Sequence, residues 1–185
     1  MLRTLFLCAV FVTVITTVAY GKKDASIYNL AVINSDQNVL LYFRVKDAFN
    51  EEMEKGITSG IPVTFTFYVT LSMQQTGLSS KKVASFNFDH TLSYDALKEE
   101  YTIIMEENNE RTIVVKDLEK AKNAMTQVND FKLMRIDKIM PDTQYAIQAK
   151  VRLGKRILPL NFHYIIPFWK FWEFNTEWSE IKFSR

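Results

Sequence analysis

The nine residues from Val63 to Leu71, VTFTFYVTL, alternate without a break between an apolar side chain and a threonine or tyrosine. Successive side chains of a β-strand point to opposite faces of the sheet. The pattern therefore predicts a strand with one face on a core and the other towards water. A strand of this kind cannot bury its apolar face alone, so the rest of the chain must supply neighbours.

Other short runs rich in β-branched and aromatic residues predict those neighbours. Turn-forming residues separate several of them, as in Asn34–Asn38 and in EENNER at 106–111. Two hairpins are expected, one around each of these turns. The further predicted strands are Ile27–Val32, Val39–Lys46, Ala84–Leu92, Tyr101–Met105, Thr112–Val115, Phe131–Ile136 and Tyr145–Leu153.

Two segments carry helix signals instead. Asp47 is predicted to cap a helix over AFNEEMEKGI, which Gly60-Ile61-Pro62 ends. Asp117 is predicted to cap a second helix, whose apolar residues recur at helical spacing: Leu118, Ala121, Met125 and Val128.

These elements together predict a mainly β fold, an antiparallel β-sandwich with two inserted helices. The regular alternation of strand and helix that nucleotide-binding folds show is missing. Residues 22–185 are enough for a single domain with its own core.

Residues 1–21 have the three-part layout of a secretory signal peptide. A positive start at Arg3 precedes the apolar stretch Leu5–Val18 and the small-residue ending Ala19-Tyr20-Gly21. The apolar stretch is shorter than the ~20 residues that span a bilayer core, so a cleaved leader is favoured over an N-terminal anchor. We expect cleavage after Gly21 and export to the periplasm or cell envelope.

The composition excludes several kinds of function. The single cysteine, Cys8, lies in the leader, so the mature chain would use neither disulfides nor thiolate ligands nor a cysteine nucleophile. A formal net charge of +2 is too small for a nucleic-acid binder, which needs a concentrated basic face. No glycine-rich phosphate loop, Gly-x-Ser-x-Gly or His-Glu-x-x-His sequence occurs, and no cofactor is expected.

Several segments together resemble an exported bacterial family, domain of unknown function 4390. They are GIPVTFTFYVTL, HTLSYDALKEEYTI, DLEKAKNAM, the strand ending in AKVRL, LPL at 158–160 and the final WSEIKF. The resemblance spans nearly the whole mature chain and implies a single domain and export in Gram-negative bacteria. It brings no assigned active site. The resemblance also implies neighbouring genes that encode a membrane sensor kinase, and with them a link to envelope signalling.

Residues that could carry chemistry are few. His90 and His163 are the only histidines, so a three-histidine zinc site is impossible and no metal site is expected. His90 lies on the apolar side of its predicted strand, which favours a hydrogen-bonded structural role over catalysis. The paired carboxylates at 99–100 and 106–107, like those near 51–54, fall in polar runs that are expected to be solvated.

The sequence SYDALKEEY at 93–101 is the most distinctive stretch outside the predicted core. We expect Ser93 to cap a short helix that Tyr94 and Leu97 dock onto the sheet. The alternative is a recognition loop led by Tyr94 and Asp95.

Aromatic residues are concentrated near the C-terminus, between 162 and 183, and include every tryptophan of the chain. The favoured hypothesis is that they close the core, because each buried ring removes ~150–250 Å² from water. A patch that binds a partner protein or apolar ligand, and peripheral contact with a membrane surface, are the alternatives. The candidate binding residues here are Phe168, Trp169 and Trp172.

The leading functional hypothesis is a non-enzymatic interaction module of the cell envelope, whose partner is an envelope or membrane-associated protein. The second is a carrier that holds a lipid or another apolar ligand within the sandwich. The third is a hydrolase-type enzyme, which would require a polar cleft that brings His90 or His163 together with carboxylates.

Overall fold

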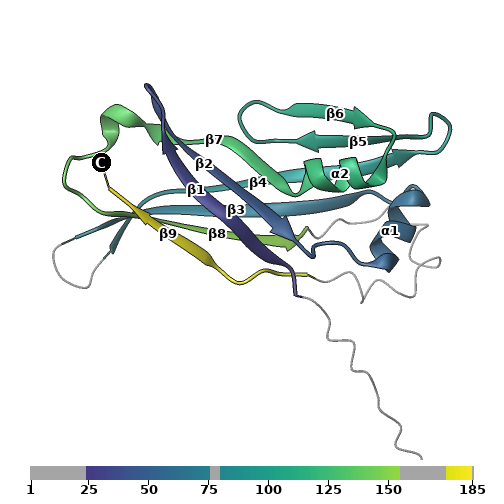
Figure 1. The fold of residues 1–185 in the computed structure, drawn as a ribbon, viewed down its shortest axis with the longest axis horizontal. Coiled ribbons are helices and arrows are strands. Elements are labelled where there is room, and N and C mark those ends of the chain that lie inside the picture. Colours follow the sequence, from purple (N-terminus) through teal and green to yellow (C-terminus); the bar gives the residue numbers. More distant parts are fainter. Residues whose placement is uncertain (1–23, 76–79, 155–173, 185) are drawn as a thin grey trace, which may run out of the picture.

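The computed structural model describes residues 24–75, 80–154 and 174–184, in which two antiparallel sheets pack against each other (Figure 1). The smaller sheet contains, in order, β1 (Ser26–Asn34), β2 (Asn38–Lys46) and β7 (Gln127–Arg135). The larger sheet runs from edge to edge through β6 (Arg111–Val115), β5 (Glu100–Met105), β4 (Ser80–Asp95), β3 (Val63–Gln74), β8 (Tyr145–Leu153) and β9 (Ser179–Phe183). The predicted β-sandwich with two inserted helices is confirmed. The predicted leader, residues 1–21, lies outside the described residues.

Strand β3 lies at the centre of the larger sheet, between β4 and β8. Its apolar side chains are buried, as the alternation predicts: Val63, Phe65, Phe67, Val69 and Leu71. The opposite side chains are partly exposed, except for Thr64, whose hydroxyl is hydrogen-bonded to that of Thr91 at 2.9 Å.

Aromatic rings fill much of the space between the two sheets. From the smaller sheet, Phe43 and Phe131 are buried against the larger one. The Phe67 ring lies 5.9 Å from Phe43 and 5.2 Å from Phe88, and Phe88 lies 4.8 Å from Phe131 (centroid distances). These contacts join the sheets into one core.

Helix α1 (Glu51–Thr58) begins later than predicted. Its N-cap is Asn50, whose side chain accepts a hydrogen bond from the backbone N–H of Met53 at 2.8 Å. The prediction that Asp47 caps it is wrong, because Asp47 has φ +54° in the turn that leaves β2. The residues between are used for packing: Ala48 is buried, and the Phe49 ring lies 5.1 Å from that of Phe65.

Helix α2 (Leu118–Met125) begins as predicted, since the Asp117 side chain accepts a hydrogen bond from the N–H of Lys120 at 2.8 Å. Ala121 and Met125 are buried, and the helix contacts β4, β5 and β6 (Figure 1). Val128 is also buried, but it belongs to β7 rather than to the helix. Helix α2 thus covers a part of the larger sheet that the smaller sheet leaves open.

The short helix predicted at Ser93 is wrong, because the chain forms a hairpin between β4 and β5 there. Pairing with β5 holds Ser93 opposite Thr102, and Tyr94 opposite Tyr101, with the two tyrosine rings 4.6 Å apart. Leu97 is 98% exposed at the tip and does not dock onto the sheet.

The C-terminal aromatic residues divide into three groups. Phe168, Trp169 and Trp172 lie outside the described residues. Phe174 packs edge-on against Phe65 at 4.6 Å, and Phe183 stacks on Tyr145 at 5.5 Å, in agreement with a core role. Trp178 is 49% exposed, with the Lys150 ammonium 5.7 Å from its ring centroid.

Candidate functional site

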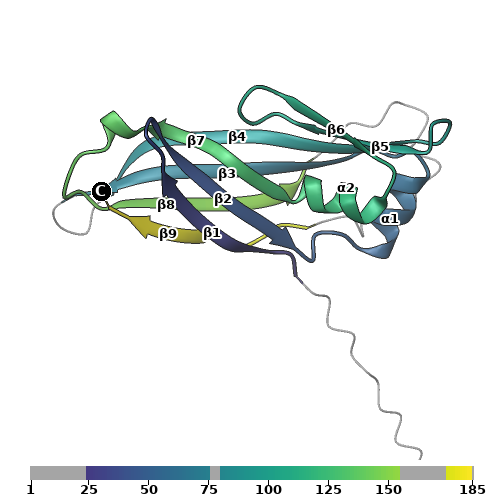
Figure 2. The same ribbon diagram turned by 45° about the horizontal axis from the view of Figure 1, so that its top comes forward.

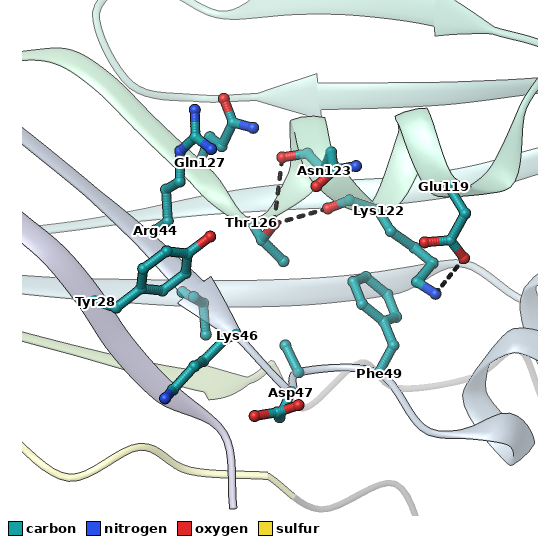
Figure 3. A pocket seen from close by; sticks show the side chains of 12 residues that line it. Tyr28, Arg44, Lys46, Asp47, Phe49, Glu119, Lys122, Asn123, Thr126 and Gln127 are labelled. Atoms are coloured by element: carbon teal, nitrogen blue, oxygen red, sulfur yellow. Dashed lines mark hydrogen bonds and ion pairs between the residues drawn. The ribbon is translucent and has the colours of Figure 1, made fainter.

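An open pocket of about 320 Å³ lies where β1 and β2, the turn at 47–49 and helix α2 meet (Figure 3). Three separate segments of the chain supply its walls. Its lining is mostly polar, and it contains both cationic and anionic side chains: Tyr28, Arg44, Val45, Lys46, Asp47, Ala48, Phe49, Glu119, Lys122, Asn123, Thr126 and Gln127.

Two aromatic rings face the pocket from opposite sides. Figure 3 shows the Tyr28 hydroxyl pointing inward from β1 and the Phe49 ring rising from the turn. Phe49 is fixed from behind by Phe65, which itself contacts Phe174. Tyr28 lies directly opposite Arg44 in the antiparallel pairing of β1 with β2. The ring positions are therefore set by the core on one side and by strand register on the other.

The back of the pocket is the C-terminal end of α2. The single proton of the Thr126 hydroxyl is shared between the carbonyls of Lys122 at 2.9 Å and Asn123 at 3.2 Å, in the last turn of the helix. The N–H of Val45 donates to the Thr126 carbonyl at 3.0 Å. This bond ties the helix end to β2 and fixes the depth of the pocket.

One side of the pocket carries a compact ion network. The Lys122 ammonium lies 2.5 Å from Glu54 Oε1 of α1 and 2.6 Å from Glu119 Oε1, and 5.7 Å from the centre of the Phe49 ring. Burial opposes the charge of Lys122, but hydrogen bonds to Glu119 and Glu54 outweigh it and raise the pKa of the ammonium. Lys122 therefore stays charged at neutral pH, and its charge is neutralised within the protein.

The other side of the pocket carries cations of a different kind. Arg44 and Lys46 are exposed, and neither forms an ion pair with any carboxylate in the described part of the chain. Both point to the outer face of β2, because residues two apart in a strand share a face. Arg44 lies towards the Gln127 amide and the Tyr28 hydroxyl, which can donate further hydrogen bonds, whereas the Lys46 side chain extends away from both (Figure 3).

This arrangement suits an anionic group on a larger partner. A guanidinium binds a carboxylate through two parallel N–H donors, and a nearby hydroxyl can add a third. Asp47 and Glu119 also line the pocket, so an anion is favoured at the Arg44 end only. Sequence reasoning missed the site because its residues come from three segments, although exposed cations at alternate positions of β2 were a visible signal.

The most enclosed ionisable pair of the described residues lies elsewhere. His90 is fully buried, with Nδ1 2.8 Å from the Met125 carbonyl and Nε2 2.7 Å from Glu107 Oε2. A carbonyl only accepts, so Nδ1 donates to it, and a proton must also lie between Nε2 and the carboxylate. The second carboxylate oxygen, Oε1, has an ion-pair contact of 3.5 Å with Arg111 but no hydrogen bond within the described residues.

This pair confirms the predicted structural role of His90 and corrects the prediction for Glu107. The Glu107 side chain is 1% exposed rather than solvated, whereas Glu106 is exposed as expected. Both nitrogens of His90 are occupied, and its ring packs against Phe67 at 4.4 Å. The ring is fully buried in the described part of the chain, so it is poorly placed to act on a substrate.

The candidate residues Tyr94 and Asp95 do not line the pocket. Asp95 ends β4, and its Oδ1 accepts hydrogen bonds from the N–H groups of Leu97 at 2.9 Å and Lys98 at 3.2 Å. Its carboxylate therefore stabilises the turn between β4 and β5. Burial, with the nearby Tyr94 and Asp117, raises the pKa of Tyr101, whose ring lies tilted against that of Tyr94.

The described residues contain no group of three or more His, Cys, Asp or Glu side chains arranged to hold a metal ion. None of their helices combines the length and the apolarity needed to cross a membrane.

Comparison with known proteins gives one match. A family model described as a domain of unknown function (DUF4390) matches residues 22–182. Neither the curated proteins nor the solved structures contain a match to the chain.

Proposed function

The chain belongs to the family described as domain of unknown function 4390, and we propose that it is a non-enzymatic binding module of the bacterial cell envelope. The pocket between β2 and α2 receives an acidic segment of a partner protein. Export is supported by the leader-like sequence of residues 1–21.

The observation that carries this proposal is that Arg44 and Lys46 form no ion pair with any of the residues that the structure describes. Both lie on the rim of a pocket whose aromatic walls are held in place by the fold. In contrast, Lys122 on the opposite side is bound by two glutamates. A partner carboxylate can therefore bind at the Arg44 end without displacing an internal ion pair. Binding at Lys122 would be less favourable, because the carboxylate would first have to displace Glu119.

A protein partner fits this site better than a small apolar ligand. The pocket is open, and its lining is mostly polar. The aromatic contacts of Phe67, Phe88 and Phe131 fill the space in which a carrier would hold its ligand. Organic extraction of the purified protein, followed by mass spectrometry, separates the two hypotheses, because an equimolar lipid in the extract would favour the carrier.

The enzyme hypothesis has less support than binding. It needed a cleft that brings a histidine together with carboxylates, and His90 meets Glu107 only in the closed interior, with both ring nitrogens engaged. His163 lies outside the described residues.

The test is a titration of isotope-labelled protein with a hexaglutamate peptide, followed by NMR. We expect amide shifts to concentrate at Tyr28, Asn123 and Thr126, with weak binding on the order of a millimolar dissociation constant. A double substitution Arg44→Ala/Lys46→Ala should weaken binding at least about tenfold, because it removes both unpaired cations.

The matched control is Lys81→Ala/Lys82→Ala, which removes two exposed cations from the start of β4. The control should leave the affinity within about twofold of the unmodified protein, since screened charges far from the site contribute little. Shifts spread evenly over all lysines, or equal losses in both double variants, would show that only bulk charge attracts the peptide.

A further inference from the structure

Strand β6 lies at one end of the larger sheet, and its outer edge is unpaired among the residues described. Figures 1 and 2 show it outermost in the sheet, beyond β5. Within the described residues, no backbone hydrogen bond joins β6 to any element other than its partner β5. Its exposed face carries Thr112 and Val114, the latter 53% exposed. Unpaired strand edges of this kind are templates for pairing with another chain.

The free edge of β7, in contrast, is hydrogen-bonded by a side chain. The Asn108 amide donates to the Asp130 carbonyl at 2.7 Å, and its Oδ1 accepts from the N–H of Lys132 at 3.2 Å. One side chain thus imitates a neighbouring strand and blocks the addition of another there. The structure shows no comparable block on β6 among the described residues.

The sequence of β6 is complementary to itself in antiparallel orientation. When two copies pair about a twofold axis at Ile113, Thr112 of each faces Val114 of the other, and Arg111 faces Val115. This register is the one that uses all five residues of the strand. It also places Glu110 opposite Lys116, two exposed side chains without an ion pair in the described part of the chain.

These charges flank the strand: Glu110 directly precedes β6, and Lys116 directly follows it, in a bend. Opposite charges directly across an antiparallel pair are favourable, and like charges are unfavourable. The twofold axis doubles the effect, since each copy contributes one Glu110 and one Lys116.

The strand is also held in a fixed position. At one end of the β5–β6 hairpin, Glu107 binds His90 and Asn108 binds β7. The inner residues Ile113 and Val115 pack on the core, and α2 contacts the strand. A strand that is ordered before it binds loses less conformational entropy on pairing.

We propose that two copies of this chain associate through β6 and form one continuous antiparallel sheet, with Glu110 of each copy paired to Lys116 of the other. None of the residues that line the pocket belongs to β6, so the association is separate from the proposed binding of an acidic partner. An interface of one short strand is small, and a dissociation constant on the order of 10–100 µM is expected.

Sedimentation equilibrium of the purified protein, from about 1 to about 500 µM, tests the proposal across that range. The protein should pass from monomer to dimer. Glu110→Lys alone and Lys116→Glu alone should each raise the dissociation constant at least about tenfold, because each places like charges opposite one another twice. The double variant should return it to within about threefold, because the pairs are restored with exchanged signs.

The control Lys81→Glu changes an exposed charge at the start of β4, which pairs there with β3 and not with β5, and it should not change the dissociation constant. Circular dichroism establishes that each variant is folded. A protein that stays monomeric over the whole range overturns the proposal. So does a dimer that single reversals leave unchanged, or one that the double variant fails to restore.

Discussion

Replacing Glu107 by Ala tests the buried ion pair. The carboxylate is 1% exposed, and its Oε2 is 2.7 Å from Nε2 of a histidine that is fully buried. Removing one partner of such a pair costs ~3–5 kcal/mol, because the remaining group is left buried without compensation. We expect the free energy of unfolding to fall by about 3 kcal/mol.

Urea unfolding at neutral pH, followed by tryptophan fluorescence and circular dichroism, measures this loss. With an m-value of about 2 kcal/mol/M, the midpoint should fall by about 1.5 M. Glu106→Ala is the matched control, since Glu106 is exposed and loses one hydrogen bond, to the N–H of Asp89 at 3.1 Å. That variant should lose no more than about 1 kcal/mol.

A double-mutant cycle with His90→Gln then isolates the interaction between the two residues. Because the two side chains touch, their losses should fail to add by at least about 1.5 kcal/mol. If Glu107→Ala and Glu106→Ala are equally stable, or if the losses at 90 and 107 add, then the carboxylate is solvated and the buried pair does not exist in solution.

Two further predictions concern single contacts. Asn108→Gly should lower stability by about 1 kcal/mol and speed hydrogen exchange at the Lys132 amide, because it removes both bonds to the β7 edge. Asn109→Gly is its control, because this residue also has positive φ but forms no side-chain hydrogen bond within the described chain. Equal effects of the two substitutions would contradict the role given to the Asn108 hydrogen bonds. Lys122→Met should be less stable than the unmodified protein at pH 8, because the ion pairs are lost. The raised pKa of Lys122 means that its contribution is present below the unfolded value of about 10.4 and disappears as pH rises through the folded value. The stability difference should therefore shrink as the pH rises through the folded pKa of Lys122, and a constant difference would assign the loss to packing.

The sequence predicted the strands well because the signal of a half-buried strand is local. In β3 each apolar residue is two positions from the next, so the side that faces the core can be read directly from the order of residues. Helix starts are less certain, since Asp47 and Asn50 are both good N-caps and lie three residues apart. In the structure Asn50 is the N-cap, and Phe49 before it packs against Phe65. This contact joins residues that are distant in the sequence, so it could not be predicted locally.

The buried pair was missed although a signal for it was present. Glu107 continues the alternation of Tyr101, Ile103 and Met105, which all face the core. His90 occupies an inward position on β4 and lies directly opposite Met105. Two ionisable residues in the apolar register of paired strands predict that they meet inside. The neighbours of Glu107 in the sequence are polar, and a run that is polar on average is predicted to be exposed to solvent. This average hid the inward position of Glu107 in the alternation.

The pocket could not have been predicted in the same way, because it depends on the distance between segments that are remote in the chain. Nothing local shows that the end of α2 returns to β2, where the N–H of Val45 binds the Thr126 carbonyl. Charge patterns on single elements do carry information. The exposed cations of β2 alternate as they must to share one face, and whether such cations are unpaired is decided only by the tertiary fold.

The anchored turn at Glu107 and Asn108 and the outer edge of β6, unpaired among the described residues, belong to the same β5–β6 hairpin. Strand β6 touches the rest of the sheet through β5 alone, so a hairpin without other support would fray at its edge. The buried Glu107 and the side chain of Asn108 tie its turn to β4 and to β7, which belongs to the other sheet. A buried ion pair contributes little net stability compared with apolar packing, yet it strongly fixes which groups meet. Fixing the turn holds β6 in place, which is the condition for recognising a second copy at low entropic cost.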